Sequence, residues 1–133
     1  MQPARPVHAA TLSGKFKQLM TVGPHRFVAD EPVADGGEDY GPNPFELVAA
    51  GLAACTSMTV KMYADHKGWA LRHVDAAVTA VREAGSLVLK RVVRFDGDLD
   101  ETQRARLLEI ANRCPVHRAL SGAITIETAV QAS

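Results

Sequence analysis

The apolar segment at residues 44–67 constrains the fold of this chain most, because it carries the marks of a helix at both ends. Asn43 can cap the helix, Pro44 suits its first position, and the carboxylate of Glu46 can reach back to the cap. Gly68 is placed to end it. Since the first half is apolar all round and rich in alanine, we expect a long, buried central helix that lets other backbones approach closely.

The segments on either side of this helix predict a mixed α and β chain. Runs of β-branched residues around Gly-containing turns indicate two hairpins, and an apolar stripe opposite Arg and Glu side chains indicates a shorter helix. The last segment alternates apolar and polar residues, as a half-buried strand does. In chain order, the predicted elements are an N-terminal hairpin (7–30), a loop (31–43), the central helix (44–67), a second hairpin (71–97), a helix (100–112) and a closing strand (122–130).

Length and composition predict one domain with a thin core. The chain has 133 residues, which is within the usual size of a single domain. It is 47% hydrophobic but only 5% aromatic, so Ala, Val and Leu side chains must fill most of the core. Because a small domain buries a smaller fraction of its surface than a large one, we expect the chain to share a core with a second copy in a homodimer.

The charge balance and the start of the chain make several partners unexpected. Fifteen Lys and Arg residues balance fifteen Asp and Glu residues, so no net positive field attracts nucleic acid. Residues 1–6 lack the apolar region of a secretory signal, and no run approaches the roughly 18 apolar residues of a membrane span. We therefore expect a cytoplasmic protein without nucleic-acid or membrane partners.

The two cysteines, Cys55 and Cys114, are the main candidates for chemistry. In a reducing compartment a disulfide persists mainly where it is transient or catalytic. Cys114 lies between Arg113 and His117, and it becomes a helix N-cap if Pro115 opens a short helix; both features favour a thiolate. The alternative for Cys114 is a helix-terminating Cys-Pro beside a solvated basic cluster. Cys55, taken alone, is typical of ordinary core packing.

Other polar residues give weaker signals. The Cys114–His117 spacing could ligate a metal, but a closed zinc site needs four ligands and the remaining histidines show no second paired spacing. We therefore expect neither a metal nor a cofactor. Glu46 serves either as a helix cap or as an acceptor that positions Arg26 or a substrate. Arg26 could donate a fork of hydrogen bonds to a peroxide oxygen, or it could be a surface charge.

Two stretches of the sequence resemble a known family. Residues 36–55 (GGEDYGPNPFELVAAGLAAC) and residues 114–117 (CPVH) are similar to the two signature regions of OsmC/Ohr proteins, and the order of elements agrees along essentially the whole chain. The resemblance implies an α+β fold of the OsmC-like type. In that fold, two antiparallel hairpin-based sheets surround a long buried central helix in an intertwined homodimer, and each active site draws on both subunits.

The resemblance also implies a cysteine-based peroxidase. The cysteine that matches Cys55 attacks an organic hydroperoxide and becomes a sulfenic acid, which condenses with the cysteine that matches Cys114; a lipoyl-type or other dithiol then reduces the disulfide. Glu46 and Arg26 are the further catalytic candidates. In the hydroperoxide reductases a glutamate directly follows the helix-opening proline, whereas here Phe45 stands there and the acid comes one residue later.

Some alternatives stay open at this point. Lys15 or Lys17 could take the thiol-activating role in place of Arg26, and the pattern around residues 30–37 is closer to an OsmC-like branch whose substrates the resemblance does not give. A second hypothesis is a redox-sensing or ligand-binding protein, with an apolar groove beside Phe45, Met58 and Met62 and without efficient turnover. A third is that both thiols are passive.

Overall fold

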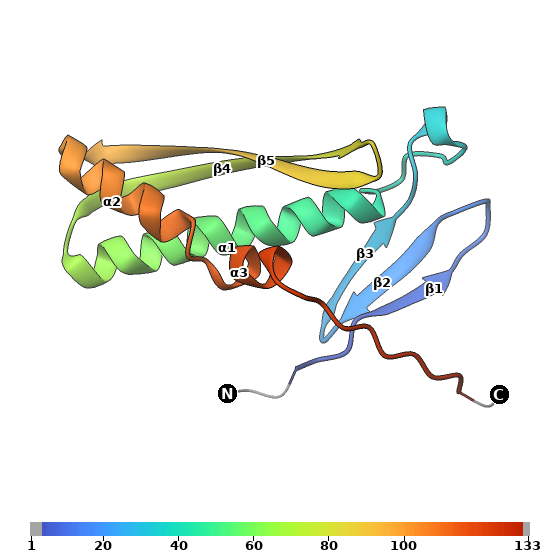
Figure 1. Ribbon diagram of the computed structural model, residues 1–133. Helices are drawn as coiled ribbons and strands as arrows, with labels where there is room; N and C mark the ends of the chain where they lie inside the picture. Colours follow the sequence, from blue (N-terminus) through green and yellow to red (C-terminus); the bar gives the residue numbers. More distant parts are fainter. Residues whose placement is uncertain (1–3, 132–133) are drawn as a thin grey trace. The chain divides into compact units, whose positions relative to one another are not determined.

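The computed structural model describes residues 4–131, and the contacts within it divide the chain into two compact units, Met1–Ala49 and Ala50–Ser133 (Figure 1). Helix α1 (Pro44–Lys67) begins in the first unit and ends in the second. Each unit contains one antiparallel sheet, and the helices complete a mixed architecture. The predicted α+β class is therefore confirmed, while the expectation of one domain stays a prediction.

A three-stranded antiparallel sheet forms the first unit. Its strands, in the order in which they pair, are β1 (His8–Thr11), β2 (Gln18–Val22) and β3 (His25–Ala29). Strands β2 and β3 are the predicted hairpin, and Gly23 in the turn has a φ of 54°, which glycine adopts readily. Because β1 also pairs with β2, the segment predicted as one hairpin contains three strands.

The loop predicted at residues 31–43 is organised by the carboxylate of Asp30, which is buried. Asp30 accepts hydrogen bonds from three backbone N–H groups of this loop, at 2.8, 3.3 and 3.1 Å: those of Glu31, Glu38 and Tyr40. A single 3₁₀ turn, η1 (Val33–Asp35), lies between them. One side chain thus satisfies backbone donors that a loop without regular structure leaves unpaired.

Helix α1 begins and ends where the sequence predicts. The side chain of Asn43 accepts from the N–H of Glu46, and the Glu46 carboxylate accepts from the N–H of Asn43, each at 2.8 Å. This is the predicted capping box, in which two exposed helix-terminal donors are satisfied reciprocally. Gly68 follows the last residue of the helix with a φ of 71°, which is the left-handed ending that glycine favours.

In the single chain α1 is buried along one face only, so the expectation of a fully buried helix is met in part. The buried positions in the second unit recur every four residues, at Leu52, Thr56, Val60 and Ala64. On another face, Met58 and Met62 are 70% and 68% exposed. Within the second unit, therefore, the other elements cover one side of the helix and leave apolar side chains exposed on another.

By length and composition, α1 is a helix that could cross a membrane. A core helix of a water-soluble protein meets the same criteria, so one such helix is weak evidence. The absence of a membrane partner stays a prediction.

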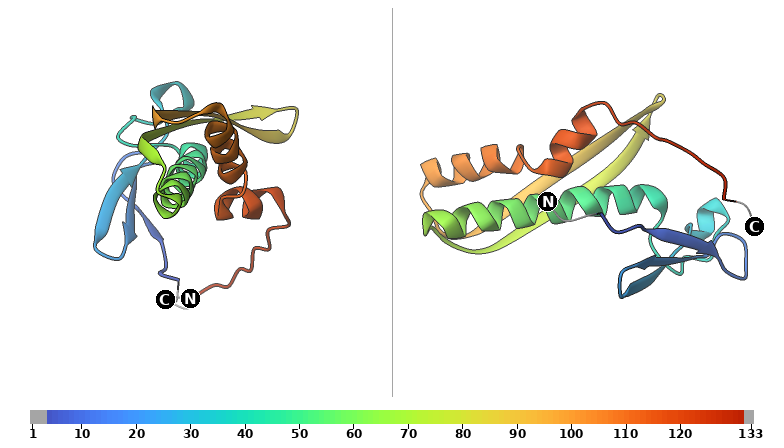
Figure 2. Two further views of the ribbon diagram at one scale, coloured as in Figure 1. Left: turned by 90° about the vertical axis from the view of Figure 1, so that its left-hand side faces the viewer. Right: turned by 90° about the horizontal axis from the view of Figure 1, so that it is seen from below.

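The second unit places helices α1 and α2 against the same face of a long two-stranded ribbon (Figures 1 and 2). Strands β4 (Ala70–Glu83) and β5 (Ser86–Asp98) are the second predicted hairpin. Their turn lies at Ala84 and Gly85, one residue earlier than predicted, where φ is positive at both positions (48° and 81°). Helix α2 (Glu101–Ala111) starts after its N-cap Asp100 and agrees with the predicted helix to within one residue at each end.

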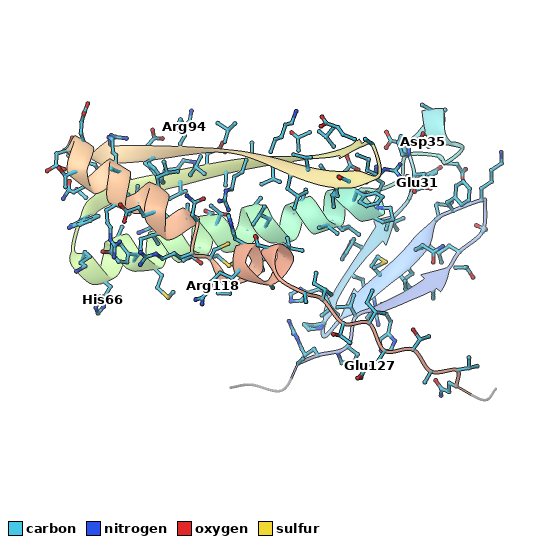
Figure 3. The ribbon with its side chains drawn as sticks, in the orientation of Figure 1. Glu31, Asp35, His66, Arg94, Arg118 and Glu127 are labelled. Atoms are coloured by element: carbon cyan, nitrogen blue, oxygen red, sulfur yellow. The ribbon has the colours of Figure 1, made fainter. Side chains whose placement is uncertain are left out.

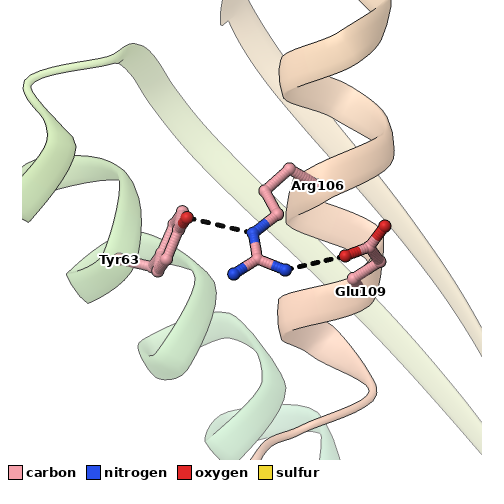
Figure 4. A network of polar contacts seen from close by, with 3 residues as sticks. All are labelled: Tyr63, Arg106 and Glu109. Carbon is pink, nitrogen blue, oxygen red and sulfur yellow. Dashed lines mark hydrogen bonds and ion pairs between the residues drawn. The ribbon is translucent and has the colours of Figure 1, made fainter.

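The core of the second unit lies between the ribbon and the two helices. Its buried members are Val60, Ala64, Leu71, Leu107, Ile110 and Ala111. At the edge of this core, Arg106 of α2 donates from Nε to the hydroxyl of Tyr63 at 3.0 Å and from NH1 to Glu109 at 2.7 Å (Figure 4). The Tyr63 ring packs edge-on against Trp69 at 5.6 Å between centroids. The hydrogen bond from Arg106 to Tyr63 thus links α2 to α1.

The end of the chain differs from the prediction. A short helix, α3 (Pro115–Ser121), follows α2, and the described residues 122–131 contain no strand, so the predicted closing strand at 122–130 is corrected. Ile124, Ile126 and Val130 are all exposed. Alternation indicates which side chains share a face, but a strand also needs a neighbouring strand for its backbone hydrogen bonds, and this segment has none within the described part of the chain.

Candidate active site

Cys114 occupies the N-cap of α3, as the sequence analysis anticipated for a helix opened by Pro115. Its backbone is extended (φ −62°, ψ 144°), and its Sγ accepts a hydrogen bond from the N–H of His117 at 3.3 Å. The side chain is fully buried. Cys114 therefore does not merely end the preceding helix. Its thiol caps α3 and is held in a fixed position.

Cys55 lies on the part of α1 that faces this cap and is partly buried. Its Sγ is 3.8 Å from the hydroxyl of Thr59, one turn further along the helix. The Cys114 thiol is close enough to Cys55 to lower its pKa, and Thr56, the next residue of α1, lies 3.9 Å from Cys114 Sγ through its hydroxyl. Both cysteines are free thiols. The fold thus brings together two sulfur atoms from distant parts of the sequence.

The surroundings of Cys55 favour its thiolate. Burial alone would raise the pKa of Cys55, but four neighbouring groups act in the opposite direction and lower the pKa below its ordinary value of 9.0. In decreasing order of effect, these are the backbone N–H of Val116, the thiol of Cys114, the hydroxyl of Thr59 and the charge of Arg91. A thiolate is the nucleophilic form of cysteine, so Cys55 is prepared for attack on an electrophile.

Arg91, on β5, is the residue of this site that sequence reasoning missed. Its guanidinium contacts side chains of all three helices. NH1 donates to Thr56 Oγ1 at 3.0 Å, and NH2 lies 2.7 Å from Asn112 Oδ1 and 3.0 Å from His117 Nδ1. An arginine can only donate, so Nδ1 of His117 accepts and the ring proton of the neutral imidazole is on Nε2.

A signal for Arg91 was present in the strand pattern. The side chains of β5 alternate between a more exposed and a less exposed face. Leu89, Val93 and Phe95 lie on the less exposed face, and Arg91 lies on the same face. A charged residue among apolar ones on the covered face of a strand needs hydrogen-bonding partners, because an unpaired buried charge is costly. That requirement indicates a polar site, but the alternation does not tell which helices supply the partners.

A pocket adjoins Arg91 and His117, two members of the polar network around Cys114. It has a volume of about 220 Å³, and its lining comprises Leu52, Leu87, Leu89, Arg91, His117, Leu120 and Ser121. Arg91 and His117 belong both to this pocket and to the polar network, so the pocket has an apolar wall and one polar end. The groove expected beside Phe45, Met58 and Met62 does not coincide with this pocket.

The other predicted site residues belong to the first unit. Glu46 is engaged in the capping box with Asn43, which is the structural role considered for it. Arg26 lies on β3 opposite Thr21 and is exposed. Lys17 stacks over the Tyr40 ring at 4.3 Å. Catalytic roles for Glu46 and Arg26, and for Lys15 or Lys17 in place of Arg26, stay predictions.

Within the described residues, no group of three or more His, Cys, Asp and Glu side chains is arranged to hold a metal ion. The polar groups around Cys114 form a hydrogen-bond network that joins Thr56, Arg91 and His117.

Fold and site together define an α+β protein with a two-cysteine site. Residues 36–129 match the family described as OsmC-like protein, so the chain belongs to the OsmC-like family and the resemblance seen in its sequence is confirmed. No curated protein matches the chain.

Solved structures of this family share the fold at low sequence identity. An OsmC-like protein from Mycoplasma pneumoniae is 21% identical, with a TM-score of 0.76, covering 92% of this chain and 90% of the other. The organic hydroperoxide resistance protein OsmC of Legionella pneumophila is 21% identical, with a TM-score of 0.71 and 92% of each chain covered. The organic hydroperoxide resistance protein OhrB of Bacillus subtilis is 23% identical, with a TM-score of 0.63, covering 90% of this chain and 91% of the other.

Proposed function

We propose that this protein is a thiol-dependent peroxidase that reduces organic hydroperoxides through Cys55 and Cys114. The observation that carries the proposal is the partly exposed thiol of Cys55, whose pKa is lowered in part by a second, buried thiol, that of Cys114. Family membership and the names of the structural relatives from Legionella pneumophila and Bacillus subtilis support a role in hydroperoxide resistance.

In the first reaction the Cys55 thiolate attacks the terminal oxygen of the hydroperoxide. An S–O bond forms, the O–O bond breaks, and its electron pair leaves with the alkoxide, which takes a proton from water to become an alcohol. Cys55 is oxidised to a sulfenic acid. The lowered pKa of Cys55 supports its assignment as the attacking sulfur, since a thiolate is required.

In the second reaction Cys114 attacks the sulfenic sulfur of Cys55. The S–S bond forms, the S–O bond breaks, and hydroxide leaves with the proton of Cys114 as water. A dithiol reductant, of the lipoyl type or another kind, then returns both cysteines to thiols by exchange and is itself oxidised to a disulfide. The proximity of Cys114 supports this pathway, because a nearby thiol traps the sulfenic acid before irreversible oxidation.

The pocket beside Arg91 and His117 indicates the class of substrate. Leu52, Leu89 and Leu120 are among the side chains of its apolar wall, while Arg91 and His117 offer donors at its polar end. Such a pocket suits a hydroperoxide with a hydrocarbon group better than it suits hydrogen peroxide, because burial of the hydrocarbon contributes binding energy.

A homodimer belongs to this proposal, and we place the protein in the cytoplasm. The exposed side chains of Met58 and Met62 on α1, and of Ile124 and Ile126 after α3, support a second copy as their cover. Sedimentation velocity should give twice the mass of one chain. Met58→Glu should shift the protein toward monomer, while Leu108→Glu, at an exposed leucine of α2, should leave the dimer intact. A monomeric wild type would overturn this part.

One experiment tests the chemistry. Intact mass is measured before and after one equivalent of cumene hydroperoxide, for wild type, Cys55→Ser and Cys114→Ser. Wild type should lose two hydrogen atoms, Cys114→Ser should gain one oxygen atom, and Cys55→Ser should be unchanged. Dihydrolipoamide should restore the mass of the wild type.

Continued consumption of hydroperoxide by Cys55→Ser would overturn the mechanism. A wild type that forms no disulfide but retains a small apolar molecule in native mass spectrometry would instead favour the ligand-binding alternative, and the pocket beside Arg91 is the place where such a molecule would fit.

A further inference from the structure

A single guanidinium connects the elements that carry the two thiols. Arg91 of β5 contacts Thr56 of α1, Asn112 at the end of α2 and His117 of α3. Two of these residues also contact Cys114: Thr56 Oγ1 lies 3.9 Å from its Sγ, and the His117 N–H donates to that Sγ at 3.3 Å. No role for Arg91 follows from the motifs in the sequence.

We propose that Arg91 is a positioning residue of the peroxidase site, which holds Cys114 against Cys55 and keeps a positive charge beside the reacting thiolate. The inference rests on the proposed function and deepens it by assigning the cation that the sequence analysis looked for among Arg26, Lys15 and Lys17. Unlike those three residues, Arg91 lies in the same unit as both cysteines.

Geometry favours arginine over lysine at this position. The planar fork presents several N–H donors in fixed directions, so one side chain satisfies acceptors on three helices at once. Arg91 pairs with Val78 on the neighbouring strand β4. Its neighbours on the less exposed face of β5 are Leu89 and Val93. A charge in such surroundings is held in place by its acceptors, because losing them leaves it poorly solvated.

Arg91 also sets the chemistry of the pocket that it lines together with His117. By occupying Nδ1 of His117, it fixes the tautomer that carries its proton on Nε2. Arg91 from β5 thus acts on Cys55 through its charge, and His117 from α3 contacts Cys114 through its backbone N–H.

The test compares three variants of the full-length protein. Arg91→Met keeps the approximate length of the side chain but removes charge and donors, and Arg91→Lys keeps the charge but not the fork. Arg94→Met is the matched control, because Arg94 is an exposed arginine of the same strand that points away from the helices (Figure 3). Peptide mass spectrometry follows iodoacetamide labelling of each cysteine as a function of pH, and stopped flow follows disulfide formation after hydroperoxide addition.

We expect Arg91→Met to move the labelling profile of Cys55 to higher pH and to slow labelling at neutral pH by no more than a few-fold, because the charge of Arg91 is the smallest of the four effects that lower the pKa of Cys55. Arg91→Lys should keep a labelling profile close to wild type yet form the disulfide more slowly. Arg94→Met should match wild type in both measurements. A wild-type labelling profile in Arg91→Met, with disulfide formation also unchanged, would overturn the inference.

Two further outcomes are separated by this design. If Arg91→Met does not fold, Arg91→Lys decides, because undiminished disulfide formation in that variant would show that the fork is not needed. If wild type itself forms no disulfide with hydroperoxide, the proposed function fails. The labelling profile, which needs no peroxide, then still decides whether Arg91 activates Cys55: an unchanged profile in Arg91→Met overturns the inference, and a profile at higher pH supports it.

Discussion

The hydroxyl of Thr56 lies 3.9 Å from the Sγ of Cys114, although 58 positions separate the two residues. The same hydroxyl donates its hydrogen to the Leu52 carbonyl at 2.7 Å and accepts from Arg91 at 3.0 Å. Its only hydrogen is thus committed, so toward Cys114 it can act only as an acceptor. A hydrogen bond in this contact therefore uses the thiol hydrogen of Cys114, so the Thr56 hydroxyl and the Cys55 sulfur compete for that one hydrogen.

Thr56→Val should destabilise the protein and slow disulfide formation. The substitution keeps the shape of the buried side chain but leaves the Arg91 donor without its acceptor on α1, at a cost of about 1–3 kcal/mol in the free energy of unfolding. Urea denaturation measures this loss. Thr79→Val, at an exposed threonine of β4, should change stability by less than about 0.5 kcal/mol. Equal losses in both variants would contradict the role of Thr56.

The lowered pKa of Cys55 should appear in the pH dependence of stability. The folded state favours the thiolate of Cys55. Its contribution to the free energy of unfolding is therefore complete above the ordinary thiol pKa of 9.0 and is lost as pH falls through the lower pKa of the folded protein. The free energy of unfolding of wild type minus that of Cys55→Ser should therefore increase with pH over this window. A difference that is constant from pH 6 to pH 9 would contradict the lowered pKa.

Thr59 offers an independent check on the same thiol. Its hydroxyl lies 3.8 Å from Cys55 Sγ and is one of the groups that lower the pKa of Cys55. Thr59→Val should therefore raise the pKa of Cys55 and slow its alkylation at neutral pH by a few-fold. Alkylation of Cys114, which is buried, should remain slower than that of Cys55 in both proteins. Faster labelling of Cys55 in Thr59→Val would be inconsistent with this account.

Asp30 should make the first unit sensitive to acid. Burial tends to raise its pKa, but the N–H groups of Tyr40, Glu31 and Glu38, together with the charge of Lys17, lower it below 3.8. Its stabilising contribution is therefore complete above pH 3.8 and is lost as pH falls through the lower pKa of the folded state. Asp30→Asn should lower the Tm at neutral pH, and the difference from wild type should shrink in strong acid.

Asp35 provides the control for this measurement, because it lies in η1 with an exposed side chain. Asp35→Asn should leave the Tm close to that of wild type at both pH values. If Asp30→Asn and Asp35→Asn had the same Tm at neutral pH, the three backbone hydrogen bonds of Asp30 would not be what stabilises the loop.

Leu107 and Leu108 form a matched pair of adjacent leucines on α2. Leu107 belongs to the core cluster and is 0% exposed, whereas Leu108 is 52% exposed. Leu107→Ala should lower the free energy of unfolding by about 2–5 kcal/mol, because a cavity remains where the side chain packed. Leu108→Ala should cost less than about 1 kcal/mol. Comparable losses in urea denaturation would contradict the position of α2.

Much of the secondary structure could be predicted from local signals. The Asn43 cap, Pro44 and Gly68 placed the ends of the central helix. Each signal acts within a few residues, through a side chain that pairs with a nearby backbone group, so it can be read without knowing the fold. The N-cap position of Cys114 was accessible for the same reason.

The meeting of the two thiols, the role of Arg91 and the state of the last segment depended on tertiary structure. Packing of α1, α2 and α3 on the ribbon decides which side chains face one another across long sequence separations, and spacing along the chain carries no record of that. The alternating residues 122–130 specify a face but no pairing partner, so they form no strand in the single chain. Short-range capping and turn chemistry are therefore determined by the sequence itself, whereas long-range hydrogen bonds and shared burial exist only once the chain is folded.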